Sequence, residues 1–337
     1  MNRRMLGVWI PLAAAIIGGC ASHEEGPPPL SSPTFDRALA LLQTQAHSPD
    51  PVVRANCIEA VQASRDPRAM EIIEQGLHDD QWVVRFSAAM TAGKRKATAV
   101  RPVLNTLVTA DPNGSVRVAC IYALRMLGDT THMNDLAKAL VDPDPSTRAN
   151  TALVLGMMGD DSAIPLLKGQ QNEPDIRVKF ELTSALARLG DTASQQVIVA
   201  WAVDKYAEDQ WNAMTVCADL PREVGLSPLL LGLEDVPAKL PPDVDRNLVQ
   251  DLTTRRQLVA ARSLAKLHIG SGAKLALDNL KSPVPNFRAL AALALGEMLD
   301  SRQAPGLEPL LSDPDDSVKR AAAAAVISIY ARAAAGT

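Results

Sequence analysis

The sequence predicts an all-α protein, an α/α superhelix (solenoid) of about eight to nine short helical repeats. Only 3% of the 337 residues are aromatic although 47% are apolar. The core must therefore be packed from small and aliphatic side chains, which favours closely spaced helices over a sandwich or barrel. A unit of about 31 residues recurs along the chain and carries an apolar position at a fixed place. Such a unit cannot bury its own apolar faces, so neighbouring units must stack.

An export signal precedes the repeats. Arg3 and Arg4 form a basic start, residues 5–17 are an apolar run, and Ile17-Gly18-Gly19-Cys20 closes it with small residues before a cysteine. The run of thirteen residues is too short to span a bilayer. The closing four residues resemble the lipobox of bacterial lipoproteins, which implies a signal peptide over residues 1–19 and lipid attachment at Cys20. The alternative is ordinary signal-peptide cleavage.

The resemblance also predicts a location. Residues 20–34 are interpreted as the lipidated Cys20 and a flexible tether, because residues 21–34 are rich in Pro, Ser and Glu. The protein is then expected in the bacterial cell envelope, held to a membrane by its N-terminal lipid and facing the periplasm. Ala21 after the cysteine resembles the outer-membrane sorting signal. The formal net charge of -4 gives no general field for nucleic acid, and no nucleic-acid partner is predicted.

The repeats follow from nine anchors at spacings of 31, 32, 31, 31, 31, 47, 31 and 31 residues. The anchors are Arg54, Arg85, Arg117, Arg148, Lys179, Gln210, Gln257, Arg288 and Lys319. Six residues before each anchor stands a residue, usually an acid, that we expect to be the N-cap of a first helix. Seven residues after each anchor stands an apolar residue that we expect to be buried. Many units then turn at Gly-Asp and enter a shorter second helix, often with Pro near its start.

An acid followed six residues later by arginine is the most specific part of the unit. Three units keep this pair unbroken: Asp79 with Arg85, Asp111 with Arg117, and Asp142 with Arg148. The pattern resembles the HEAT repeat, especially the short variety of phycobilin lyases, over residues 35–334. The resemblance implies that these residues form a structural ladder between adjacent repeats, interrupted at Gln210 and Gln257. Nine units stacked at roughly 10 Å per layer predict an arc on the order of 90 Å.

Motifs for catalysis are scarce. Deoxyhypusine hydroxylases of the same repeat type hold two irons with His-Glu pairs in several repeats, whereas the only such pair here is His23-Glu24 in the tether. The other histidines are scattered over distant units: His47, His78, His132 and His268. No Cys-x-x-Cys, nucleophile elbow or phosphate-binding glycine loop occurs. The sequence therefore predicts no catalytic residue, metal or cofactor and no enzymatic activity. The alternative is a lyase-like or hydroxylase-like enzyme, or a chromophore- or metal-handling protein.

The three cysteines of the repeats are expected to be small core residues. Cys57 and Cys120 hold equivalent positions two repeats apart, too far for a disulfide. Cys217 falls in the apolar column and should be buried.

The period breaks between Gln210 and Gln257, where sixteen extra residues fall near 235–250. The prolines of this insert predict a loop. The neighbouring second helices, around residues 197–201 and 229–233, are apolar all round, although a helix lining an open concave face should have a polar side. Those helices must be covered.

Two interpretations of the insert remain. In the first, it folds back over the apolar helices through Val236, Leu240 and Val244. In the second, it is the rim of a site that anchors a protein partner. The residues of that candidate site are Val199, Trp201, Leu230 and Leu231.

These features together predict a lipid-anchored, exported scaffold that binds another protein of the cell envelope, because solenoids usually present extended surfaces to proteins. A purely structural spacer is a further possibility.

Overall fold

A computed structural model describes residues 32–170, 172–204, 209–235 and 245–335. Its regular structure is helical, and these residues contain no strand. The predicted all-α solenoid of short repeats is therefore confirmed. Among the helices so described, none is long and apolar enough to cross a membrane. Residues 1–19 and Cys20 lie outside the described residues.

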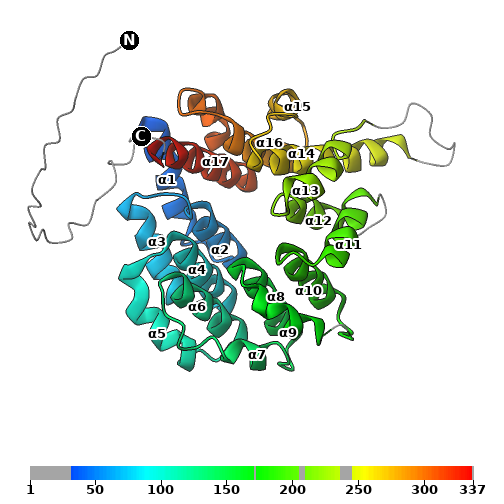
Figure 1. The fold of residues 1–337 in the computed structure, drawn as a ribbon. Coiled ribbons are helices and arrows are strands. Elements are labelled where there is room, and N and C mark those ends of the chain that lie inside the picture. The colour runs from blue at the N-terminus through cyan, green and yellow to red at the C-terminus, as the bar shows by residue number, and fades with distance from the viewer. Residues whose placement is uncertain (1–31, 171, 205–208, 236–244, 336–337) are drawn as a thin grey trace, which may run out of the picture.

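The first helices of the repeats form an inner layer, in which each packs on the next (Figure 1). They are α2 (Pro51–Ala60), α4 (Trp82–Arg95), α6 (Gly114–Met126), α8 (Pro145–Met158), α10 (Ile176–Arg188), α12 (Gln210–Cys217), α14 (Arg246–Lys266), α16 (Pro285–Met298) and α17 (Asp316–Ala335).

The second helices form an outer layer with fewer contacts among themselves. They are α1 (Pro33–Gln45), α3 (Pro67–Leu77), α5 (Arg101–Ala110), α7 (Asp135–Ala139), α9 (Ile164–Lys168), α11 (Thr192–Val203), α13 (Arg222–Leu231), α15 (Ala273–Asn279) and the 3-10 helix η3 (Ala304–Ser312). Two short 3-10 turns, η1 (Thr98–Val100) and η2 (Asp161–Ala163), lead into α5 and α9. The sequence analysis expected the second helices to line the concave face. This expectation is wrong, because the first helices line it.

Glycines let the inner helices approach closely. A Cβ atom at Gly156 would lie 2.7 Å from the Cα of Ala185 on the next inner helix. A Cβ at Gly296 would lie equally close, 2.7 Å, to the Cα of Ala325. Only glycine permits such contact between backbones. Because the inner layer packs more tightly than the outer one, the stack curves.

The curvature closes the solenoid into a ring (Figure 1). The first helix, α1, packs on the last, α17, where the rings of Phe35 and Tyr330 meet edge-on with centroids 5.7 Å apart. Arg37 of α1 pairs with Glu308 of η3 at 3.1 Å. The predicted arc on the order of 90 Å is therefore wrong, because a spacing along the chain carries no information about curvature. In other repeats a second helix packs on the first helix of the next repeat, as α3 packs on α4. The helix α1 packs on α17 in the same way.

The predicted apolar column is buried throughout. None of its nine residues is more than 6% exposed. They are Val61, Ala92, Leu124, Leu155, Leu186, Cys217, Leu264, Leu295 and Val326. The prediction that Cys57, Cys120 and Cys217 are core residues is also confirmed, since all three are free thiols in the interior. Burial raises the pKa of each thiol to about 12, so these thiols stay protonated and unreactive.

The first helices begin later than the sequence analysis placed them. Their N-caps stand four residues before the anchor in several repeats, as with Asp50, Asn113, Asp144 and Asp175, whose side chains accept from backbone N–H groups of the first turn. The acids two residues earlier are therefore not the caps.

The part of the insert that the structure describes also departs from the prediction of a loop. Residues 246–250 form the start of α14, capped by Asp245, so Asp251 lies within a helix. The prolines of the insert all precede residue 244 and leave this stretch free to be helical. Val236, Leu240 and Val244 lie outside the described residues.

Candidate functional site

The acid and arginine columns join adjacent repeats edge to edge. In each pair the Nε and Nη2 atoms of an arginine donate to both carboxylate oxygens of the next repeat, at 2.7–3.0 Å. The pairs are Arg54 with Asp79, Arg85 with Asp111, Arg148 with Glu173, and Arg288 with Asp313. Within its own repeat, each of these arginines also donates through Nη1 to a main-chain carbonyl six residues earlier. The columns therefore hold the stack together.

Two members of the expected ladder are not joined. Arg117 donates to the carbonyl oxygens of Asp111 and Pro112, and in the described part of the chain it makes no ion pair with Asp142. The ladder also changes at Gln257, whose Nε2 donates to the carbonyl of Leu233 at 3.0 Å and to Asp235 at 2.9 Å. A neutral amide thus spans the same junction without a full charge.

The four residues of the predicted anchor site differ in exposure. Trp201 is half-buried and stacks on Phe180 of α10, with centroids 5.6 Å apart and an interplanar angle of 21°. Val199 is half-buried beside it in sequence, whereas Leu230 and Leu231 at the end of α13 are 44% and 47% exposed. The leucines therefore face solvent, and Trp201 serves the packing of the repeat.

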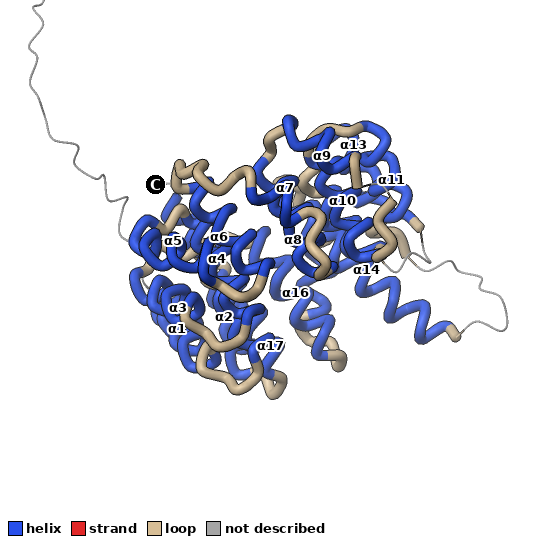
Figure 2. Tube along the Cα trace, turned by 90° about the horizontal axis from the view of Figure 1, so that it is seen from below, coloured by secondary structure: helices blue, strands red, loops and turns tan. Residues whose placement is uncertain are grey.

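Other apolar side chains are exposed on the elements next to α13. The helices α11 and α14 both contact α13, and the first turns of α14 project from the ring (Figures 1 and 2). The exposed residues, which we call the outer apolar surface, are Val197 and Val203 of α11, Leu230 and Leu231 of α13, and Leu248 and Leu252 of α14. Leu248 and Leu252 are 57% and 47% exposed and stand one helical turn apart. The sequence analysis missed both because it assigned residue 248 to a loop.

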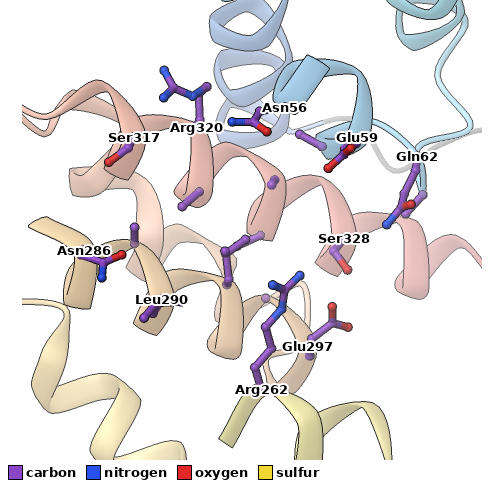
Figure 3. A pocket seen from close by; sticks show the side chains of 18 of the residues that line it. Asn56, Glu59, Gln62, Arg262, Asn286, Leu290, Glu297, Ser317, Arg320 and Ser328 are labelled. Carbon is purple, nitrogen blue, oxygen red and sulfur yellow. The ribbon is translucent and has the colours of Figure 1, made fainter. Parts of the chain in front are cut away.

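A pocket of about 410 Å³, lined by both polar and apolar side chains, lies on the inner face of the ring, between α2, α16 and α17, and reaches Lys94 of α4 and Arg262 of α14 (Figure 3). We call it the inner pocket. Glu59, Glu297 and Arg320 also line it. Its residues come from five helices that meet only where the two ends of the chain join, so their spacing in the sequence gives no sign of it.

The family follows from the sequence. A model described as HEAT repeats matches residues 38–125, 100–187, 133–218 and 247–328. The chain belongs to the HEAT-repeat family. No curated protein matches it.

Two solved structures resemble this HEAT-repeat ring at low similarity. One is human deoxyhypusine hydroxylase in complex with glycerol, at 17% identity and a TM-score of 0.34, covering 88% of this chain and 96% of the other. The other is the complex of CpcE and CpcF of phycocyanin lyase from Nostoc sp. PCC7120, at 19% identity and a TM-score of 0.35, covering 89% and 97%. Both names denote enzymes, which contradicts the prediction that this chain has no enzymatic activity. That exclusion is withdrawn, and at these scores neither activity is assigned to this chain.

The histidines of the HEAT ring do not converge. Among the described residues, no three His, Cys, Asp or Glu side chains are placed to hold one metal ion. His132 lies 3.3 Å from Asp135 within its own turn, and His47 contacts Gln75 of the next repeat. These two histidines therefore take part in local contacts only.

Proposed function

We propose that the protein is a HEAT-repeat scaffold that is anchored by a lipid on Cys20 and binds another protein of the cell envelope through the outer apolar surface. The observation that carries the proposal is the pair Leu248 and Leu252 on a helix end that projects from the ring. An exposed apolar stripe one turn long is the kind of feature that packs against an apolar groove or helix of a partner. Leu230 and Leu231 of α13, a helix that contacts α14, are exposed as well.

The first experiment tests the surface. Burying a leucine side chain contributes about 1.5–3 kcal/mol when it passes from full exposure to full burial. Leu248 and Leu252 are half exposed, so replacing both with serine should weaken partner binding by roughly tenfold. The measurement is quantitative capture of the partner from native envelope membranes after cross-linking. The matched control is Leu277→Ser on α15, which is 50% exposed and lies outside this surface.

Capture that is equal for wild type and the double variant would contradict the proposed surface. A loss of capture in Leu277→Ser of the same size would show a general effect of surface hydrophobicity. Thermal melts of both variants check that folding is intact, which is expected because the replaced side chains are exposed.

The second experiment tests the anchor. Cys20 alone follows a short apolar run and small residues near the start of the chain. Cys20→Ser should release the protein to the soluble fraction or stall the removal of residues 1–19. A variant that remains in the membrane at the size of the processed protein would refute lipid attachment at this residue.

A further inference from the structure

The inner pocket has room for a small molecule. Its volume of about 410 Å³ falls in the usual range of ligand sites. The space exists because α2, α16 and α17 present small side chains to it. These residues are Ala60, Ala63, Ala289, Gly296, Ala321, Ala324 and Ala325.

Three cations line the pocket without a carboxylate partner. Lys94 donates to the amide oxygen of Gln62 at 3.3 Å, and Arg320 donates to the amide oxygen of Gln45 at 3.3 Å. Arg262 extends from α14 into the space beside α16 and α17 (Figure 3). Within the described residues no salt bridge joins any of the three to a carboxylate, although Glu297 lies beside Arg262 (Figure 3).

The two acids of the pocket are engaged elsewhere. Glu297 lies 3.5 Å from the guanidinium of Arg332. Glu59 accepts a hydrogen bond from the hydroxyl of Ser87 at 3.1 Å. The field in the pocket is therefore positive on the side of α14.

Arg262 is the cation least satisfied by its surroundings. Its Nε is buried and has no hydrogen-bond partner among the described residues. An N–H left unpaired in this way costs free energy. Burial lowers the pKa of Arg262 below its ordinary value, and the charge of Glu297 only partly offsets this.

The next turn of α14 adds to the positive field. Burial, followed by the charges of Arg262 and Lys94, lowers the pKa of Lys266, against the opposing effects of Asp219 and Glu297. Asp219 is itself paired with an arginine of α10 at 3.0 Å. An anion placed beside Arg262, Lys94 and Lys266 would be favoured by the charge of each of these cations.

We propose that the inner pocket binds a small molecule through a carboxylate or phosphate group held by Arg262 and Lys94. The polar remainder of the ligand would meet the neutral side chains of the pocket, which are Asn56, Gln62, Asn286, Ser317 and Ser328. This site is separate from the outer apolar surface and does not depend on a protein partner.

The test is isothermal titration calorimetry of the full chain in detergent with inorganic phosphate and, in a parallel arm, with citrate. Sodium chloride at matched ionic strength is the blank. A charge-assisted hydrogen bond contributes about 1.5–3 kcal/mol, so Arg262→Gln and Lys94→Gln should each weaken binding by about tenfold or more. The matched control is Arg302→Gln, which removes an equal charge from an exposed arginine whose recorded partner is Asp300 in its own loop.

Binding of either anion that Arg262→Gln and Lys94→Gln weaken and Arg302→Gln leaves unchanged supports the proposal, and the arm that responds distinguishes phosphate from carboxylate recognition. No heat beyond the chloride blank in either arm would overturn it. So would equal affinities in wild type and Lys94→Gln. Lys94 is exposed, so its variant decides the matter even where Arg262→Gln fails to fold.

Discussion

Replacing Phe35 with alanine tests whether the two ends of the chain are joined. Phe35 is 3% exposed on α1, and its ring meets that of Tyr330 on α17 edge-on at 5.7 Å. Truncating a buried phenylalanine costs about 3–5 kcal/mol. About 0.5–1.5 kcal/mol of this belongs to the aromatic pair. Because Tyr330 is on the last helix, the loss falls on the junction that closes the ring.

Amide hydrogen exchange followed by mass spectrometry reads this loss helix by helix. In Phe35→Ala, a weakening of 3–5 kcal/mol should raise the opening equilibrium of α17 by about two to four powers of ten. The helix α6, on the far part of the ring, should exchange as in wild type. Phe180→Ala is the control, since Phe180 is also buried, at 7%, but stacks on Trp201 away from the junction.

Two results would refute the closed ring. One is unchanged exchange in α17 of Phe35→Ala, which an open arc predicts because α1 would then contact only its own end of the stack. The other is an equal rise in α17 exchange for Phe180→Ala, which would show global destabilisation in place of a broken junction.

Three further predictions concern the joints between repeats. Arg85→Ala should lower the free energy of unfolding by about 3–5 kcal/mol in urea melts, because it removes the ion-pair partner of Asp111, which is only 4% exposed. A loss below about 1 kcal/mol would instead mark an ordinary surface pair. Gly296→Ala should lower the free energy of unfolding by about 1–3 kcal/mol, because the new Cβ meets the backbone of α17. Gly306→Ala is the control and should be neutral, because a Cβ there would have nothing within 4 Å. Equal melting temperatures for the two variants would exclude the close approach at Gly296. The hydrogen bond from its arginine partner lowers the pKa of Glu173 below its ordinary 4.5, so the pair stabilises the fold above pH 4.5 and this contribution is lost as pH falls further. The difference in melting temperature between wild type and Glu173→Gln should therefore be largest at neutral pH and shrink below pH 4.5, and a difference that is constant down to pH 3 would contradict the assignment.

The repeat frame was predictable because burial is strictly periodic. Every residue seven places after an anchor is apolar, and a column of that kind has no stable place on a surface. The ring was not predictable, because closure depends on a small rotation at each joint that accumulates around the stack. Glycines such as Gly156 and Gly296 set that rotation through contacts with another helix, and their meaning appears only once the partner helix is known.

The helix starts were misplaced for a simpler reason. Acids stand both six and four residues before three of the nine anchors, as Asp142 and Asp144 do before Arg148, and an acid at either place can cap a helix. The proline that follows Asp144 was the signal that decides between them, because proline favours the first helical position. The acid six residues before the anchor is therefore not needed as a cap. In four other repeats this acid pairs with the arginine of the preceding unit.

Ring closure determines what each face can bind. The inner pocket offers about 410 Å³, which is room for a small molecule, whereas the leucines of the outer apolar surface are exposed to a folded partner. The projecting start of α14 is where the repeat period is interrupted, and it carries the exposed leucines away from the ring. The same helix reaches the pocket with Arg262, four turns or so further along its length at 3.6 residues per turn. Because Leu248 and Arg262 lie at distant points of one rigid helix, loss of partner binding and loss of anion binding are separable by single substitutions. Each proposal therefore stands or fails by itself.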